Sequence, residues 1–282
     1  MHWQTSRYQI DLRQPRVMGI VNVTPDSFSD GGQHGGSRAA LAHCERLVLQ
    51  GADILDIGGE STRPGSPVVP LSEELSRVLP VVREAVHMGV PVSVDTYKPE
   101  VMRAVLDLGV DIINDIWALR QGDAVEVVAA HRACGVCLMH MHRDPQTMQT
   151  MPMTDEVLPT VTRFLQQRAQ ALRTAGVVAQ RIALDPGIGF GKTVAQNFSL
   201  LAHQRDLLAL GYPLLAGWSR KSSLGAVTGH ERPVDRVSAS VAAAVLAVDR
   251  GARVVRVHDV RETVDALRVW QAIQAGDVPA GD

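Results

Sequence analysis

The stretch VSVDTYKPEVMRAVLDLGVDIIND, residues 92–115, contains a complete strand–helix–strand unit. Val92–Val94 and Ile112–Ile113 are short apolar runs, which are typical of strands buried on both faces. Between them, Glu100–Leu108 has the length and the apolar period of an amphipathic helix. Two strands joined through a helix usually run parallel in one sheet, so this stretch predicts the repeating unit of an α/β fold.

The same unit recurs along the chain. The further apolar runs are Val17–Val23, Ile54–Gly58, Val136–Met139, Ile182–Leu184, Leu214–Ala216 and Val254–Val257. The further amphipathic stretches are Ala39–Leu49, Glu73–His87, Ala124–Arg132, Glu156–Ala175, Asn197–Leu210, Val237–Asp249 and Glu262–Ala275. Eight such units fill the ~250 residues typical of a (β/α)8 TIM barrel, whereas a doubly wound open sheet would normally use fewer strands.

No change of composition and no linker divides the chain, so we expect a single domain. Residues 17–275 are predicted to form the barrel, after an N-terminal extension at residues 1–16 and before a flexible C-terminal tail at residues 276–282. Four connections after predicted strands are long: Thr24–Ser37, Gly59–Leu71, Met141–Thr154 and Trp218–Arg236. All four lie on the face where barrel enzymes carry their chemistry.

Polar residues stand at the carboxyl end of strand after strand. The ends are Asn22, Asp56, Asp95, Asn114 with Asp115, His140, Asp185 and His258, and the seventh run stops at Gly217 just before Ser219, Arg220 and Lys221. In a parallel barrel these ends share one face. The spacing therefore predicts an active site at the C-terminal ends of the strands.

Composition limits the class of protein. The chain has 282 residues, 45% of them hydrophobic, and a formal net charge of −2, which gives no electrostatic reason to expect nucleic acid or a membrane surface as a partner. No apolar run approaches the ~18 residues of a membrane-spanning helix, and Met1–Arg16 lacks the core of a signal peptide. Cys44, Cys134 and Cys137 suggest buried thiols rather than a disulfide framework. We expect a cytoplasmic protein.

Two glycine-rich loops after the first two strands are longer than a strand-to-helix turn requires. Thr24–Ser37 contains Phe28 and Asp30, and its length indicates a lid. The second loop, Gly58–Gly65, carries Arg63, whose forked cation suits carboxylate or phosphate oxygens. A loop arginine taken alone is more often simply solvated, so the interpretation depends on its neighbours.

The segment DPGIGFGKT, residues 185–193, resembles a phosphate-binding loop but breaks both nucleotide patterns, because Pro186 and Lys192 stand where glycine is required. What remains is a carboxylate at a strand end, followed by glycines that allow the backbone or a flat ligand to approach closely.

Cationic side chains follow the last two predicted strands, where barrels often bind phosphate. Lys221 follows strand seven, and the two-residue spacing of Arg256 and His258 turns both side chains to one face. A plain structural alternative leaves Lys221 solvated and pairs Arg256 with an acid such as Asp56. A second alternative makes His140 and His142 zinc ligands of a metal-dependent hydrolase barrel, although such barrels would carry a His-x-His pair on strand one.

Together these motifs closely resemble the dihydropteroate synthases, which act in folate biosynthesis. The matching stretches are MGIVNVTPDSFSDGG (18–32), GGESTRPG (58–65), SVDTYKPEV (93–101), IINDI (112–116), CLMHM (137–141), LDPGIGFGK (184–192), GWSRKS (217–222) and RVHDV (256–260). They extend over all eight predicted strands. The resemblance implies a transferase that condenses 6-hydroxymethyl-7,8-dihydropterin diphosphate with 4-aminobenzoate to give 7,8-dihydropteroate and diphosphate.

The resemblance also implies a pterin site at the strand ends. A pterin presents a row of N–H donors, and a carboxylate can accept two of them, which is the role implied for Asp185. Ile116 and Met139 would sandwich the ring. The implied pterin-binding residues are Asp95, Asn114, Ile116, Met139, Asp185, Gly217 and Lys221.

The implied diphosphate-binding residues are Asn22, Thr62, Arg63, Arg256 and His258, with Mg²⁺ as cofactor and Asn22 as its protein ligand. The implied aminobenzoate-binding residues are Phe28, Thr62, Pro64, Phe190, Lys221 and Ser222. The catalytic residues would be Asp95, Lys221, Arg256, His258 and Asp30. Sulfonamides should compete with aminobenzoate, and the partners would be these small molecules and a second copy of the chain in a homodimer.

Two positions depart from the common family residues: Tyr97 stands before Lys98 where a serine is more frequent, and Trp117 replaces a frequent arginine. Neither belongs to the implied catalytic set. The remaining enzymatic alternative is a barrel that transfers a methyl group from a folate, which shares the Asp–Asn–Asp pattern. Such an enzyme would have little need for Arg63, Arg256 and His258 around a diphosphate.

Overall fold

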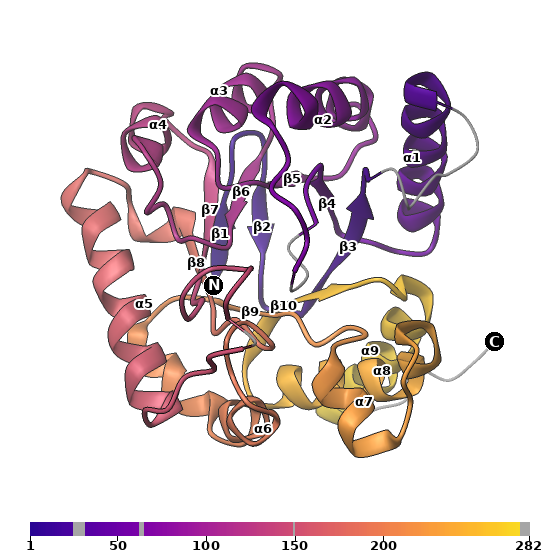
Figure 1. The fold of residues 1–282 in the computed structure, drawn as a ribbon. Coiled ribbons are helices and arrows are strands. Elements are labelled where there is room, and N and C mark those ends of the chain that lie inside the picture. The colour runs from indigo at the N-terminus through magenta and orange to yellow at the C-terminus, as the bar shows by residue number, and fades with distance from the viewer. Residues whose placement is uncertain (25–31, 62–64, 149, 277–282) are drawn as a thin grey trace.

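Eight parallel strands close into a barrel in the computed structural model of the chain, which describes residues 1–24, 32–61, 65–148 and 150–276. The strands are β3 (Arg16–Asn22), β4 (Ile54–Gly58), β5 (Val92–Asp95), β6 (Ile112–Asp115), β7 (Gly135–Met139), β8 (Ile182–Asp185), β9 (Leu214–Ala216) and β10 (Ala252–Val257). They follow each other around the barrel in chain order, and β10 closes it against β3. Figure 1 shows the helices surrounding the strands. The predicted (β/α)8 architecture is confirmed.

The helices pack their apolar sides on the outside of the strands. They are α1 (Gly32–Leu49), α2 (Leu71–Ala85), α3 (Pro99–Asp107), α4 (Ala124–Ala130), α5 (Val157–Thr174), α6 (Val194–Ala202), α7 (Ser222–Thr228), α8 (Val237–Asp249) and α9 (Val260–Ala275). In α2, Val78, Val81 and Val82 are fully buried in the core. Each such side chain contributes about 1.5–3 kcal/mol on burial, which outweighs the weak intrinsic helix propensity of valine.

The structure corrects two helix predictions and adds helices within one long connection. Helix α1 begins at Gly32 rather than at residue 39. The stretch 197–210 is two elements, because α6 ends at Ala202 and a 3-10 turn, η3 (Gln204–Leu210), follows. The long connection 218–236 contains helix α7 and the 3-10 helix η4 (Pro233–Arg236), and a further 3-10 helix, η2 (Ala179–Arg181), precedes β8.

The N-terminal extension contains a hairpin that the sequence did not reveal. β1 (His2–Gln4) and β2 (Gln9–Asp11) pair antiparallel. Trp3, Ile10 and Leu12 of this segment are buried. They pack on residues toward the amino-terminal ends of the barrel strands: Met18, Ile54, Ile112, Cys137, Ala183, Leu215 and Val254. The Trp3 indole N–H donates to the carbonyl oxygen of Arg181 at 2.9 Å. The hairpin therefore plugs the end of the barrel opposite the strand carboxyl ends.

Strand register sets the geometry of the other end. Asn22 pairs with Gly58, Gly58 with Asp95, and Asp95 with Asn114, so four strands finish at one level. Across the barrel, Met139 pairs with Asp185. Parallel pairing in register therefore brings residues that are far apart in the chain to one shared face.

Two further expectations concern the thiols and the membrane. Cys44, Cys134 and Cys137 are free and buried, as predicted, and burial raises the pKa of the Cys44 thiol to about 12. Among the helices in the described ranges, none is long and apolar enough to cross a membrane.

We predict that Trp3→Ala destabilises the barrel by about 3–5 kcal/mol, because it removes a fully buried indole and its hydrogen bond. Urea unfolding followed by far-UV circular dichroism measures this change. Val269→Ala, at a position where the side chain is 63% exposed, is the control and should stay within about 0.5 kcal/mol of wild type. Equal unfolding midpoints for the two variants would show that the hairpin does not stabilise the barrel.

Candidate active site

Three buried polar side chains, Asp95, Asn114 and Asp185, lie at the carboxyl ends of β5, β6 and β8. We call these three side chains the floor. Their strands place them at the same end of the barrel, as the sequence predicted. A buried polar group is costly unless it has a partner, so three of them gathered in one place indicate a binding function.

Arg256 on β10 links the floor to β4. Its Nε–H donates to Asp56 at 2.6 Å and its Nη2–H donates to Asp95 at 2.8 Å. The Asn114 amide also donates to Asp56, at 3.3 and 3.4 Å. The open alternative that Arg256 pairs with Asp56 is therefore what the structure shows. Asp56 supports its neighbours, and the same guanidinium reaches the floor.

Burial changes the pKa values of Asp95 and Arg256. It raises the pKa of Asp95 to about 7, since the opposing effect of Arg256 is partly offset by the carboxylate of Asp56. Burial lowers the pKa of Arg256, but the two carboxylates outweigh it and the pKa rises above its ordinary value. A guanidinium fixed between two acids remains a permanent cation at the bottom of the site.

Lys221 and Asp185 face each other across Gly217. A Cβ built on Gly217 would lie 3.8 Å from Lys221 Nζ and 3.9 Å from Asp185 Oδ2. The Lys221 ammonium donates to the Ile188 carbonyl oxygen and sits 4.7 Å from the centre of the Phe190 ring. Burial lowers the pKa of Lys221 to about 8, with Asp185 opposing the shift. Lys221 is therefore held within the site rather than solvated.

Asp185 has one oxygen engaged by the protein. The Gly187 N–H donates to its Oδ1 at 2.7 Å. Burial raises the pKa of Asp185, while Lys221 and the Gly187 N–H act in the opposite direction. Oδ2 faces the side of Gly217 and Lys221, where a ligand donor would approach.

An apolar wall stands beside the floor. Ile116 and Met139 form one buried cluster with Met141 and Met148. The two family departures, Tyr97 and Trp117, pack on this cluster and line a small cavity of about 270 Å³ next to it. The Tyr97 hydroxyl donates to Glu60 at 3.0 Å, so this tyrosine joins the outer loops and not the floor.

Of the residues implied for diphosphate binding, Arg256 lies on β10, Asn22 ends β3 and His258 directly follows β10; we call these three the rim. The His258 N–H donates to the Ser219 hydroxyl at 3.1 Å, and this hydroxyl lies 3.0 Å from His258 Nδ1. Asn22 and His258 are half-buried. Ser222 is exposed and begins α7. Phe28, Asp30, Thr62, Arg63 and Pro64 lie outside the described residues.

The structure adds an ion pair and a lysine that the sequence reasoning did not single out. Arg220, with φ of 59°, pairs with Asp259 and so ties the loop that carries Lys221 to the loop that carries His258. Lys192 is 4% exposed and lies behind Asp185. The signal was present in composition: the chain has only three lysines, Lys98, Lys192 and Lys221, among 28 basic residues.

The metal-dependent hydrolase alternative requires a cluster of metal-ligating side chains. Within the described ranges, no three His, Cys, Asp or Glu side chains are grouped to hold a metal ion. The His140 ring is buried edge-on against Phe164, and burial lowers the pKa of His140 to about 2. His140 is therefore a core residue.

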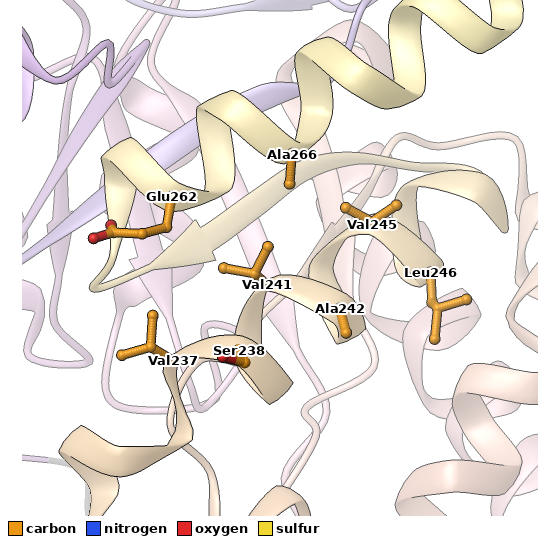
Figure 2. Close-up of a pocket in the computed structure, with 8 residues that line it drawn as sticks. All are labelled: Val237, Ser238, Val241, Ala242, Val245, Leu246, Glu262 and Ala266. Carbon is orange, nitrogen blue, oxygen red and sulfur yellow. The ribbon is translucent and has the colours of Figure 1, made fainter.

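A groove of about 680 Å³ lies elsewhere, on the outside of the barrel between α8 and α9. Its lining is mostly apolar and includes Val241, Val245 and Leu246, with Glu262 at one end (Figure 2). It lies on the outer helices, away from the strand ends, and is separate from the candidate active site.

Comparisons with known proteins agree with the architecture of the barrel. The family described as pterin binding enzyme matches residues 18–258. The dihydropteroate synthase of Neisseria meningitidis serogroup B is 50% identical over 276 residues, covering 96% of this chain and 97% of that protein.

Two solved structures are similar throughout. The dihydropteroate synthase of Xanthomonas albilineans with 4-aminobenzoic acid has a TM-score of 0.90 and 53% identity, over 96% of this chain and 98% of that one. The Burkholderia cenocepacia dihydropteroate synthase with 7,8-dihydropteroate has a TM-score of 0.88 and 50% identity, over 98% and 97% of the two chains.

We predict that Asp56→Asn lowers the free energy of unfolding by about 3 kcal/mol, because it removes one partner of a buried ion pair. Asp235→Asn is the control, since Asp235 forms an exposed pair with Arg232 and should give no measurable change. Chemical denaturation of both variants checks this. If Asp56→Asn unfolded at the wild-type midpoint, the pair would not organise the site.

Proposed function

This chain belongs to the pterin-binding enzyme family, and from that premise we infer that it is a dihydropteroate synthase. It is a transferase that condenses 6-hydroxymethyl-7,8-dihydropterin diphosphate with 4-aminobenzoate and releases diphosphate. The observation that carries this inference is the buried floor of Asp95, Asn114 and Asp185, in a chain similar over nearly its whole length to synthases of this kind.

The pterin lies on the floor with its donor edge toward Asp185. The oxygen Oδ2 accepts N–H donors of the pyrimidine edge, while Oδ1 is held by Gly187. Each charge-assisted hydrogen bond of this kind is worth about 1.5–3 kcal/mol. Asn114 and Asp95 supply further polar contacts. Lys221 reaches the carbonyl and ring nitrogen side from across Gly217.

The faces of the pterin ring contact the apolar wall. Ile116 and Met139 sandwich the ring, and their membership of one buried cluster supports this assignment. Flat heterocycles are commonly bound between apolar side chains with a few polar groups at the edge. Discrimination between pterins therefore comes from the floor, and the wall contributes affinity.

The diphosphate lies at the rim, against Asn22, Arg256 and His258, with Thr62 and Arg63 joining from the second loop. The contacts with Asp56 and Asp95 use two of the five N–H donors of the Arg256 guanidinium, so the same group can also face an anion.

We propose that Mg²⁺ assists the diphosphate, with the amide oxygen of Asn22 as its protein ligand. The fit rests on donor chemistry: a carbonyl-type oxygen at the end of β3 is a ligand that Mg²⁺ accepts, and Mg²⁺ often takes few protein ligands beside phosphate oxygens and water. When bound, the ion would neutralise charge on the leaving diphosphate.

The reaction begins with departure of the diphosphate. The bond between the exocyclic methylene carbon and the bridging oxygen breaks, its electron pair leaves with the diphosphate, and the dihydropterin ring delocalises the positive charge. Asp95, as a carboxylate, stabilises this cation from below. Since its pKa is about 7, the stabilising form is lost as the pH falls below neutrality. The amine of aminobenzoate then attacks the methylene carbon and loses a proton.

The aminobenzoate binds beside Phe190, Lys221 and Ser222, with Phe28, Thr62 and Pro64 completing its pocket. The 4.7 Å contact of the Lys221 ammonium with the Phe190 ring supports a shared wall between the pterin and aminobenzoate sites. Asp30, which lies outside the described residues, is assigned a catalytic role by the family resemblance alone. A sulfonamide, which resembles aminobenzoate, competes for this pocket.

The protein functions as a homodimer in the cytoplasm. The mostly apolar groove between α8 and α9, with Leu246 45% exposed, supports association through the outer helices. Such an interface would leave the strand ends of both copies open to substrates.

Diphosphate release tests the function directly. Purified protein is incubated with the pterin diphosphate, aminobenzoate and Mg²⁺, and diphosphate and dihydropteroate are quantified separately. We expect equal amounts of the two products, and no continued diphosphate release when Mg²⁺ is omitted. Without aminobenzoate no amine traps the cation, so diphosphate should not accumulate beyond one equivalent per site. Diphosphate release without aminobenzoate, at the same rate, would indicate a hydrolase instead.

A further inference from the structure

Lys192 is a buried cation, and no carboxylate of the described residues lies within hydrogen-bond distance of it. Its Nζ contacts three main-chain carbonyl oxygens, those of Gly187 at 2.7 Å, Phe190 at 3.2 Å and His140 at 3.3 Å. An ammonium has three N–H donors, so the carbonyls match the charged form one for one. Burial lowers the pKa of Lys192 well below its ordinary value, and Asp185 opposes that shift. Three accepting carbonyl oxygens favour the ammonium, so we take the charged form on the geometry of these contacts.

The loop that follows β8 is wound tightly around this ammonium. Gly187 and Gly191 both have φ of 69°. A Cβ at Gly187 would lie 1.8 Å from the His140 carbonyl oxygen, and one at Gly191 would lie 2.7 Å from that of His142. The loop therefore rests on the chain after β7, and the carbonyl oxygens of Gly187, Phe190 and His140 converge on one compact charge.

A lysine suits this position better than an arginine. The ammonium is a point charge with three divergent donors, whereas a guanidinium is a planar fork. The chain otherwise uses arginine for nearly all its basic residues, with three lysines among 28. Lysine is rare in this chain, and Lys192 is surrounded by carbonyl oxygens of a glycine-rich loop. We infer that the shape of the cation matters at this position.

The same loop supplies three contacts to the active site. The Gly187 N–H holds Asp185 Oδ1, the Ile188 carbonyl accepts from Lys221, and the Phe190 ring lies against the Lys221 ammonium. Each contact comes from the segment whose carbonyls Lys192 gathers. Displacement of Lys192 would therefore change the setting of both charged groups that meet the pterin.

We propose that Lys192 is a positioning residue of the active site, which fixes the loop after β8 and places a positive charge behind Asp185. This inference rests on the proposed function, because it takes Asp185 as the group that receives the pterin. Lys192 does not touch a substrate and acts through Asp185, Lys221 and Phe190.

The proposal predicts a change in pH dependence. The charged and titratable groups around Asp185 are Lys192 on its own loop, Lys221 after β9, Arg256 on β10 and Cys137 on β7. All three cations favour the carboxylate. Removing Lys192 raises the pKa of Asp185 further, so protonation begins at higher pH. Pterin binding, which needs the carboxylate, is then lost at a higher pH as the solution is acidified.

The experiment measures the pterin dissociation constant of the full-length protein by calorimetry between pH 5 and pH 8. In Lys192→Met, we expect the acid-side midpoint of the affinity loss to rise by about 1 pH unit, the low end of the effect of a nearby opposite charge. Lys192→Gln, which keeps a donor but no charge, should show the same shift, and it carries the test if the methionine variant does not fold.

Arg181→Met is the matched control. Arg181 is 3% exposed and donates to the Cys134 and Val128 carbonyl oxygens, but it lies at the amino end of β8, opposite Asp185. It should lower stability and leave the pH midpoint at the wild-type value. A wild-type midpoint in folded Lys192→Met, or an equal shift in Arg181→Met, would overturn the proposal. Turnover of the unsubstituted protein with both substrates is measured in parallel and tests the proposed function separately.

Discussion

The bridge from Arg256 to Asp56 and Asp95 is the interaction on which the rest of the site depends. Asp56, which lies in the middle of β4 and not at its end as the sequence suggested, and Asp95, at the end of the neighbouring β5, are buried carboxylates that repel each other. Each would be costly to bury without a partner. One guanidinium, donating to both at 2.6 and 2.8 Å, holds them together. Because Asn114 also donates to Asp56, the fourth strand of this group is drawn in as well.

The same arrangement explains how the site divides its charges. Arg256 and Lys221 are cations, while Asp95 and Asp185 are acids whose pKa values burial raises. In the proposed function, a flat heterocycle with donors on one edge would meet the acids, and an anionic substituent would meet the cations, Asn22 and His258. Lys192 extends the pattern one layer outward, because it organises the loop that supports Asp185 and Lys221.

Much of the fold was predictable because parallel strands are buried on both faces. β4 at Ile54–Gly58 and β9 at Leu214–Ala216 coincide with the predicted apolar runs. The N-terminal hairpin was missed, since strands of three residues are too short to show alternation. The start of α1 was missed because three of its first five residues are glycines, which have low helix propensity.

The candidate site was also partly predictable from the sequence. Residues at strand ends were predicted to share a face, and the register confirms this for Asp95 and Asn114. The partner of Arg256 stayed open, because the choice of acid depends on contacts across 161 and 200 positions of the chain. The sequence analysis noted Lys192 only as a residue that breaks a nucleotide-binding pattern. Its contacts with main-chain carbonyl oxygens leave no periodic signal in the sequence.

The central claim is that Asp185 reads the donor edge of the pterin, and calorimetry with two ligands tests it most directly. The wild-type protein should bind the pterin more tightly than its analogue without the exocyclic amino group by about 10- to 100-fold, the value of one charge-assisted hydrogen bond. In Asp185→Asn this preference should largely disappear, because the affinity for the pterin falls and that for the analogue changes little. An undiminished preference in Asp185→Asn would contradict the account.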